Sequence, residues 1–248
     1  MMEQVFPTPV DTVDPLALFA GDDRPTPPDR PWVMTNMIAS VDGAVAIDGL
    51  SGGLGGPGDK AVFSAIRGVA DIIVAAVGTV VAENYRRPQT PPVVQEAREA
   101  RGQSRFPRLA IVTNSLSIDS NHRVFDPDAP PLVITHEKAP PNRRSGLANV
   151  AEIVDAGTDR VDLRHMLTAF ADRGASVVLV EGGPTLNAAF VAEDLVDEFC
   201  LSVSPMLVGG NGPRVVGASD TSSAHSMMLD RTLHDEGFLF HRYLRNRP

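Results

Sequence analysis

The chain has very little cysteine, and its histidines are not clustered. Its 248 residues include a single cysteine, Cys200, and six histidines scattered along the sequence. One cysteine excludes an intrachain disulfide, and Cys200 lies in the apolar run Phe199–Val203, where a small buried side chain is expected. Because no His-Glu-x-x-His or Cys-x-x-Cys spacing occurs, we expect no metal site.

The chain also has fewer basic than acidic residues and lacks long apolar runs. The chain has 22 Lys and Arg against 31 Asp and Glu, a net charge of −9, which argues against a general nucleic-acid-binding surface. No apolar stretch reaches the roughly 18 residues of a membrane span. The acidic, proline-rich N-terminus does not resemble a signal peptide. We therefore expect a cytoplasmic protein that binds neither nucleic acid nor membrane.

What the chain does have is the composition of a globular α/β protein. Hydrophobic residues make up 43% and charged residues 21% of the sequence, so a substantial core can be buried. Prolines are frequent in residues 1–30, and this segment is expected to be an N-terminal arm with a short helix near 15–20. Residues 31–248 are expected to form a single domain.

Strands and helices are predicted to alternate along residues 31–248, which is typical of a predominantly parallel sheet. Continuous apolar runs such as Asp71–Val77 indicate strands buried on both faces, and the last two strands are expected to be antiparallel. The expected strands are 32–41, 71–77, 108–113, 132–135, 150–154, 176–180, 198–206 and 237–243. The expected helices are 59–69, 94–101, 161–173 and 184–192, with a short turn of helix through Glu83.

The most informative local pattern is Val177–Asn187, in which a buried strand, two glycines and a proline follow one another. Proline is favoured at the first position of a helix, and the free N–H groups of a helix N-terminus bind anions such as a pyrophosphate. Gly182 and Gly183 leave room for the backbone to approach such a group. The alternative is an ordinary strand-to-helix turn that binds nothing.

A second junction follows the same logic. The strand 71–77 ends in Gly78 and Thr79, and the threonine hydroxyl can contact a ribose or phosphate, although Thr79 can equally serve as a helix N-cap. Neither junction has the glycine spacing of the Rossmann fingerprint. A dinucleotide can still bridge both junctions if their strands are neighbours in the sheet.

Three further features are candidates for ligand contacts. Residues 49–58 include six glycines, which is typical either of a loop that approaches a ligand or of a solvated linker. Glu181, at the end of a predicted strand, is either an acceptor for a polar substrate or a solvated end residue. Arg67 is either a phosphate clamp or a side chain that points to solvent.

These patterns occur together in the order found in one enzyme family. Over about residues 32–243, the chain resembles the pyrimidine reductases of riboflavin biosynthesis, the C-terminal reductase domain of the bifunctional deaminase–reductase RibD. The matching segments are Ala39–Gly43, Arg67, Asp71–Val74, Gly78–Val80, Val180–Leu186, Leu195–Glu198 and Ser204–Gly210. The deaminase motif, His-x-Glu with Pro-Cys-x-x-Cys, does not occur in the chain, so a stand-alone reductase is expected.

The resemblance implies a homodimer with a dihydrofolate-reductase-like, three-layer α/β/α fold, a predominantly parallel central sheet and antiparallel C-terminal strands. It implies NADPH-dependent reduction of a phosphorylated heterocycle, 2,5-diamino-6-ribosylamino-pyrimidinone 5′-phosphate, to the ribitylamino compound. The implied cofactor-binding residues are Ala39, Gly53, Gly78, Thr79, Glu83, Ser115, Gly182, Gly183, Pro184, Thr185, Leu186 and Asn187. The implied substrate-binding residues are Ser51, Arg67 and Glu181, together with Arg86 or Arg87.

The match is weaker on the substrate side. Asn36 stands where the family often has lysine, Gly53 where it often has an aromatic residue, and Glu83 where it often has aspartate. The segment after Glu83, Asn84–Thr90, has no clear equivalent of the family's substrate-binding arginine. Two alternatives therefore stay open: a reductase of the same fold that acts on a pterin or dihydrofolate-like substrate, and a non-catalytic NADPH-binding protein. The sequence identifies no proton donor.

Overall fold

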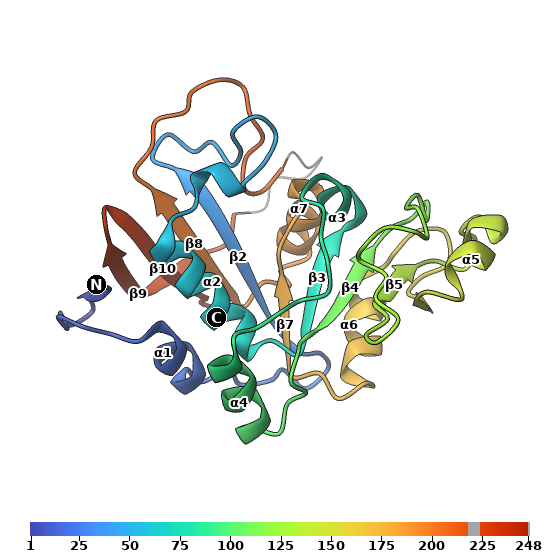
Figure 1. The fold of residues 1–248 in the computed structure, drawn as a ribbon, viewed down its shortest axis with the longest axis horizontal. Coiled ribbons are helices and arrows are strands. Elements are labelled where there is room, and N and C mark those ends of the chain that lie inside the picture. The colour runs from blue at the N-terminus through green and yellow to red at the C-terminus, as the bar shows by residue number, and fades with distance from the viewer. Residues whose placement is uncertain (218–223, 248) are drawn as a thin grey trace.

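A ten-stranded sheet forms the centre of the molecule (Figure 1). The computed structural model describes residues 1–217 and 224–247. The strands lie in the order β1-β9-β10-β8-β2-β7-β3-β4-β5-β6. Their bounds are β1 Glu3–Phe6, β2 Trp32–Ser40, β3 Ile72–Ala76, β4 Arg108–Val112, β5 Leu132–Thr135, β6 Glu152–Asp155, β7 Val177–Val180, β8 Glu198–Ser204, β9 Met227–Asp235 and β10 Phe238–Arg245.

The pairing of the strands confirms the predicted sheet. From β8 to β6 every neighbouring pair is parallel, whereas β10, β9 and β1 add antiparallel strands at one end. The central strand β2 pairs with β7 along Trp32–Thr35 and with β8 along Met34–Ser40. Strand β7 in turn pairs with β3, so the two glycine-bearing junctions follow strands that are neighbours.

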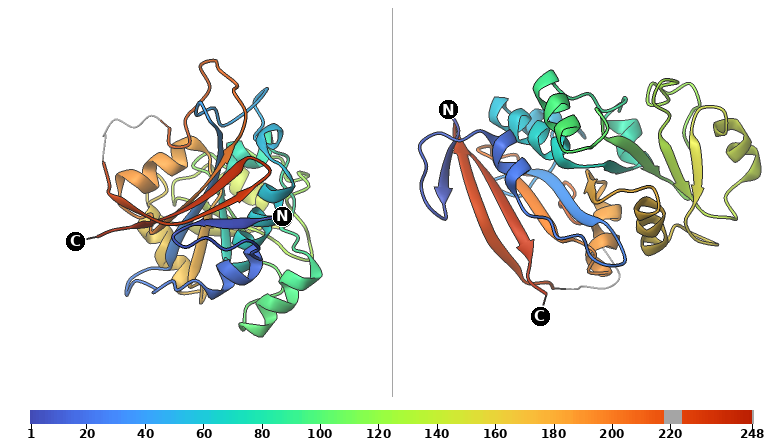
Figure 2. Two further views of the ribbon diagram at one scale, coloured as in Figure 1. Left: turned by 90° about the vertical axis from the view of Figure 1, so that its left-hand side faces the viewer. Right: turned by 90° about the horizontal axis from the view of Figure 1, so that it is seen from below.

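Helices cover both faces of the sheet and complete three layers (Figure 2). On one face α6 and α7 bury Phe170 and Phe190, and on the other α2 and α1 bury Ile66 and Phe19. The helices are α1 Pro15–Gly21, α2 Pro57–Val69, α3 Val77–Ala82, α4 Pro92–Ala100, α5 Pro141–Leu147, α6 Leu163–Ala171 and α7 Pro184–Ala192, with a 3-10 turn at Gly52–Leu54.

Helix α2 is held firmly at its C-terminal end. The guanidinium of Arg98, which is fully buried, donates to the Ala70 carbonyl at 2.6 Å, and Arg101 donates to the Gly68 carbonyl at 2.6 Å. Burial lowers the pKa of Arg98 to about 10, so the side chain stays positive at neutral pH. Both cations complement the negative end of the helix dipole, and they fix the helix that carries Arg67.

Residues 1–30, expected to be an arm, are part of the folded body. Strand β1 pairs with β9 at the edge of the sheet, and the short helix expected near 15–20 is present as α1, which begins at Pro15. The physical reason is apolar burial, since Met2 and Phe19 are both buried in the core beneath α2. Prolines here begin a helix and shape turns, roles that a proline-rich composition does not distinguish from an extended arm.

Two other elements were not expected from the sequence, namely α5 and β9. In β9 the buried positions include Arg231 and Thr232, which break the apolar pattern that identifies a strand. Arg231 is stable inside because its guanidinium donates to both carboxylate oxygens of Asp22, at 2.9 and 2.7 Å. Because a tertiary ion pair stabilises a buried arginine here, apolar periodicity alone does not predict this strand.

Glu198, at the start of β8, joins three distant parts of the chain. Its fully buried carboxylate accepts from Arg24 at 2.9 Å, from the Trp32 indole at 3.1 Å and from Arg242 at 2.9 Å. Burial alone would raise the pKa of Glu198, but Arg24 and Arg242 outweigh it and lower the pKa from 4.5 to about 2. The ionised carboxylate thus ties the N-terminal segment, β2 and β10 together.

Replacing Glu198 with Gln should destabilise the protein by about 3 kcal/mol at pH 7. It removes the fully buried counter-charge that Arg24 and Arg242 share and leaves them only their contacts with Asp22 and Asp230. The native pKa lies below the ordinary value of 4.5. The stabilisation is therefore complete above pH 4.5 and is lost as the pH falls towards about 2. Urea unfolding at a series of pH values measures this. The matched control is Glu152→Gln, whose exposed ion pairs should contribute less than about 1 kcal/mol. Equal effects of the two changes would contradict this role of the Glu198 carboxylate.

Candidate active site

The carboxyl ends of β2, β3 and β7 open into a cavity of about 790 Å³. Helix α2 and the glycine-rich loop form one wall, and α3, the start of α7 and residues 213–215 form the other. At the floor, the amide of Ala76 donates to the carbonyl of Gly182 at 2.8 Å. The two junctions singled out in the sequence are therefore in direct contact, which satisfies the condition for one dinucleotide to bridge both.

The turn before α7 is built for close approach. Gly182 has a φ of +106° and its peptide bond to Gly183 is cis. A Cβ atom added to Gly183 would lie 2.9 Å from the Thr79 hydroxyl oxygen. Helix α7 begins at Pro184 with no side-chain cap, so the N–H groups of its first turn are available to an anion.

The loop after β8 packs against this helix start. Its Val215 carbonyl accepts from the Asn187 side chain at 2.9 Å, and the Gly217 amide donates to the Pro184 carbonyl at 3.0 Å. These bonds bring Pro213, Arg214 and Val215 to the cavity wall. No local sequence pattern predicts this contact, because it joins segments about 30 residues apart through backbone groups and the Asn187 side chain.

Arg67 and Glu181 both line the cavity and form an ion pair that contains two hydrogen bonds. The Arg67 Nε and Nη2 atoms each donate to one Glu181 oxygen at 2.6 Å, and the Tyr85 hydroxyl donates to Glu181 at 2.9 Å. The guanidinium carbon also lies 4.2 Å from the centre of the Phe63 ring. Burial and the Glu181 charge raise the pKa of Tyr85 well above its usual range. The solvent-facing alternatives for both charged residues are thus excluded.

The glycine loop meets α3 at a second contact. The amide of Ser51 donates to the Glu83 carboxylate at 2.9 Å, and both residues line the cavity. Thr79 is not the N-cap of α3, since that position belongs to Ala76. The Thr79 hydroxyl instead lies beside Gly183 on the cavity wall.

Most of the residues selected from the sequence line this cavity. They are Ser51, Arg67, Gly78, Thr79, Glu83, Glu181, Gly182, Gly183, Pro184, Thr185, Leu186 and Asn187. Ala39 and Gly53 do not line it themselves, but each is next in sequence to a residue that does, Ile38 and Gly52. Ser115 is exposed beyond the end of β4, the strand next to β3.

Arg86 and Arg87 do not reach the cavity. Arg86 is exposed to solvent, and Arg87 lies against the Phe106 ring at 4.7 Å and 3.5 Å from the Asp126 carboxylate. Neither side chain is among those that line the cavity, and Arg87 contacts the segments before β4 and β5 instead. Sequence proximity to Glu83 was therefore a poor guide to where these arginines point.

Several cavity residues escaped the sequence analysis. Asp59 and Phe63 line the cavity together with Arg67, and the spacing of four residues places all three on one face of α2. That spacing was a usable signal, because Arg67 was already a candidate. Lys60, Tyr85 and Met37 also line the cavity, and no local pattern marks them. Asn36, where the family often has lysine, lines it as well.

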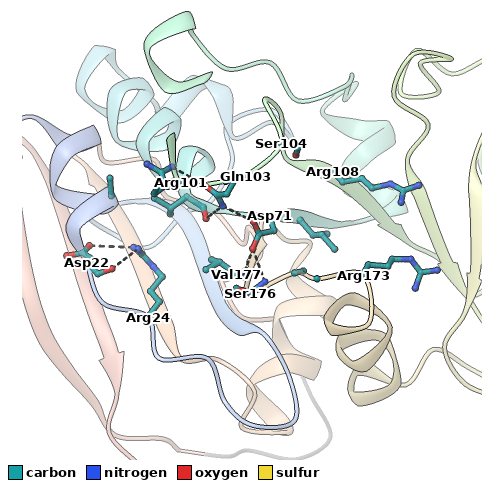
Figure 3. Close-up of a pocket in the computed structure, with 16 residues that line it drawn as sticks. Asp22, Arg24, Asp71, Arg101, Gln103, Ser104, Arg108, Arg173, Ser176 and Val177 are labelled. Atoms are coloured by element: carbon teal, nitrogen blue, oxygen red, sulfur yellow. Dashed lines mark hydrogen bonds and ion pairs between the residues drawn. The ribbon is translucent and has the colours of Figure 1, made fainter. Parts of the chain in front are cut away.

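A cavity of about 600 Å³ lies at the opposite, amino-terminal edge of the sheet (Figure 3). Its charged groups bind one another: Asp71 accepts from Gln103 at 2.7 Å and from the amides of Ser176 and Val177 at 2.8 and 2.9 Å. Arg24 is likewise engaged by Glu198. These hydrogen bonds join the loops at that edge and occupy the polar groups that a ligand would need. We therefore place the candidate site at the carboxyl edge.

Two negative findings concern the described residues only. Within residues 1–217 and 224–247, no three acidic, histidine or cysteine side chains gather closely enough to hold a metal ion. Over the same ranges, none of the helices has the length and apolar character that a bilayer crossing needs.

Comparison with known proteins reveals close relatives. The chain is 31% identical over 207 residues to the 2,5-diamino-6-ribosylamino-4(3H)-pyrimidinone 5′-phosphate reductase of Methanothermobacter thermautotrophicus, covering 82% of this chain and 93% of that protein. The crystal structure of a pyrimidine reductase-like protein from Corynebacterium diphtheriae superposes with a TM-score of 0.85 at 27% identity, covering 95% of this chain and all of that one. These likenesses confirm the dihydrofolate-reductase-like fold and the oxidoreductase class expected from the sequence.

A longer relative shows which part is shared. The riboflavin biosynthesis protein RibD of Chlamydia trachomatis is 29% identical over 187 residues, which cover 73% of this chain and 48% of that protein. The chain therefore matches about half of that protein. Residues 31–236 match the family model of the RibD C-terminal domain, and the chain belongs to the RibD C-terminal domain family.

Proposed function

We propose that this protein reduces 2,5-diamino-6-ribosylamino-4(3H)-pyrimidinone 5′-phosphate to its ribitylamino derivative with NADPH. The relative from M. thermautotrophicus bears that substrate in its name. The observation that carries the proposal is the contact of two glycine junctions beside the Arg67–Glu181 pair, because it joins a dinucleotide cradle to a polar pocket.

The cavity fits a nicotinamide dinucleotide. The space beside Gly183, which a Cβ atom would fill, and the uncapped start of α7 suit a pyrophosphate, while the Thr79 hydroxyl suits a ribose. When bound there, the reduced nicotinamide supplies a hydride. The adenosine half would extend over β4 towards Ser115, whose carbonyl accepts from Arg143 at 2.9 Å. Arg143 brings a positive charge next to Ser115 and favours the 2′-phosphate of NADPH over NADH.

The substrate end is organised by Glu181. Arg67 and Tyr85 fix the orientation of its carboxylate through three hydrogen bonds. Each oxygen keeps acceptor capacity, so Glu181 is suited to bind the amino groups of a diaminopyrimidinone. Arg67 is committed to Glu181. Lys60 also lines the cavity and is suited to the substrate phosphate, since no carboxylate lies within ion-pair distance of it among the described residues.

A second candidate substrate is a pterin or dihydrofolate-like compound. The observation that favours it is the position of Arg86 and Arg87 outside the cavity, which removes two groups expected to bind a phosphate. A flat aminopyrimidine ring without a phosphate would still find the Glu181 carboxylate. A binding protein without catalytic activity is the third candidate, and any robust turnover rules it out.

We also infer a homodimer that works in the cytoplasm, with residues 31–248 as one catalytic unit. The dimer is supported by apolar side chains exposed beyond the ends of β2 and β8. Leu207 is 81% exposed and Val41 58% exposed, and the Val41 amide donates to the Met206 carbonyl at 3.1 Å. Analytical ultracentrifugation of the full chain tests the dimer directly.

Incubation of the protein with NADPH and the pyrimidinone phosphate should consume both and form the ribitylamino compound. A parallel assay with dihydropterins and dihydrofolate compares the candidates, and the measurements are NADPH absorbance and product mass. If protein that binds NADPH does not turn over the pyrimidinone phosphate, the main proposal is wrong. Turnover of a pterin alone would establish the second candidate.

Replacing Gly183 with Ala should weaken NADPH binding on the order of 10-fold or more, a loss of about 1.4 kcal/mol or more. The added Cβ would lie 2.9 Å from the Thr79 hydroxyl oxygen, so residue 183 and Thr79 would have to move apart. Cofactor fluorescence titration measures the affinity. The control is Gly146→Ala, whose Cβ would meet nothing within 4 Å. Unchanged affinity in the Gly183 variant would remove the cradle from the cofactor site.

Replacing Ser115 with Asp should weaken NADPH on the order of 10-fold relative to NADH, since a carboxylate would repel the 2′-phosphate and compete for Arg143. Ser117→Asp, at an exposed position two residues later, is the control. Dissociation constants for both nucleotides decide the matter. Equal weakening of NADPH and NADH would show that the 2′-phosphate lies elsewhere.

A further inference from the structure

One acidic side chain of the cavity has no arginine partner. Asp59 lies in the first turn of α2 and lines the cavity on the same helix face as Phe63 and Arg67. It is half-buried, and its carboxylate packs so tightly against Gly55 that a Cβ atom added there would lie 2.9 Å from Asp59 Oδ2. The helix and the glycine loop thus hold this acid at the cavity wall.

The other acids of the cavity and the Tyr85 hydroxyl are engaged. Glu181 accepts from Arg67 and Tyr85, the Tyr85 proton is donated to Glu181, and Glu83 accepts from the Ser51 amide. No histidine lines this cavity within the part of the chain that the structure describes. Among those residues, Asp59 is the half-buried acid of the cavity that neither accepts from a cation nor is bound to a backbone amide.

We propose that Asp59 is the proton donor of the reduction. This rests on the proposed function, in which the sugar ring opens to give a carbon–nitrogen double bond. A hydride from the nicotinamide forms a new bond to C1′, and the π electron pair moves to nitrogen. The Asp59 O–H bond breaks and a new N–H bond forms, which leaves an Asp59 carboxylate that water reprotonates. One hydride and one proton together complete the two-electron reduction.

The surroundings favour the neutral acid. Burial raises the pKa of Asp59, while a hydrogen bond from Ser202 and the charge of Lys60 partly offset this. Strand β9 contributes another negative group, since Asp235 packs against Gly58 in the same helix turn, although the N-terminal amine binds it at 2.9 Å. The charged groups that face Asp59 from the other walls of the cavity are Arg67, Glu83, Glu181 and Arg214.

The first test compares Asp59→Asn with wild type in single-turnover reduction from about pH 5 to about pH 9. The amide should slow hydride transfer on the order of 100-fold and leave the dissociation constant of NADPH unchanged. In wild type the rate should fall as the pH rises through the pKa of Asp59, because the carboxylate cannot donate. This decline should be absent in the variant, and Asp59→Glu should recover part of the rate.

The control is Asp48→Asn, an exposed carboxylate of the neighbouring loop that does not line the cavity. Asp48 has a φ of 51°, which Asn tolerates, so this variant should keep the rate and pH profile of wild type. A wild-type rate and pH profile in Asp59→Asn would overturn the proposal, while the activity of wild type would still support the proposed function.

A second measurement stands even if no substrate turns over. Carbon-13 NMR of aspartate-labelled protein gives the titration of each carboxyl group, and the resonance missing from Asp59→Asn identifies Asp59. The proposal requires this resonance to titrate above the ordinary aspartate range. Titration within or below that range would overturn it, whichever substrate the protein reduces.

Discussion

The buried ion pair between Arg67 and Glu181 is the interaction on which the cavity depends. It joins α2 to the carboxyl end of β7, across 114 positions of the sequence. Two charges withdrawn from water are stable only with good geometry and additional hydrogen bonds. The two parallel bonds of Arg67 and the donation by Tyr85 meet that requirement. Because the pair tolerates little displacement, α2 must be fixed, and Arg98 fixes it by binding the carbonyls at its C-terminal end.

The order of the strands supplies what no local motif does. Gly78 and Thr79 follow β3, and Gly182 and Gly183 follow β7, with about 100 residues between them. Since β3 and β7 are neighbours, the Thr79 hydroxyl occupies the space that a side chain at Gly183 would need. The proposed cradle for a dinucleotide thus lies between two strands of a parallel sheet, at the edge where open α/β sheets bind ligands, without the Rossmann spacing of glycines.

The difference between local motifs and contacts made by distant segments explains what the sequence could predict. The glycine turn before α7 and the buried strands are encoded by adjacent residues, and they were found with nearly correct bounds. Arg86 and Arg87 do not line the cavity, and the sequence could not indicate this because the direction of a side chain after a turn depends on the loops that pack around it. Strand β9 was missed because Arg231 is buried through an ion pair with Asp22, a residue more than 200 positions away. Such tertiary pairing leaves no local trace.

Two aspartates at opposite edges of the sheet show how the fold separates structure from chemistry. Asp71, at the amino edge, accepts three hydrogen bonds, from Gln103 and the amides of Ser176 and Val177, and so cannot bind a ligand without breaking them. Asp59, at the carboxyl edge, faces a cavity with neither an arginine nor a backbone amide to satisfy it. Its carboxylate accepts a hydrogen bond from Ser202, and its remaining acceptor capacity is available to a polar ligand in the cavity. The fold thus uses Asp71 to join loops at one edge and leaves Asp59 accessible to a ligand at the other.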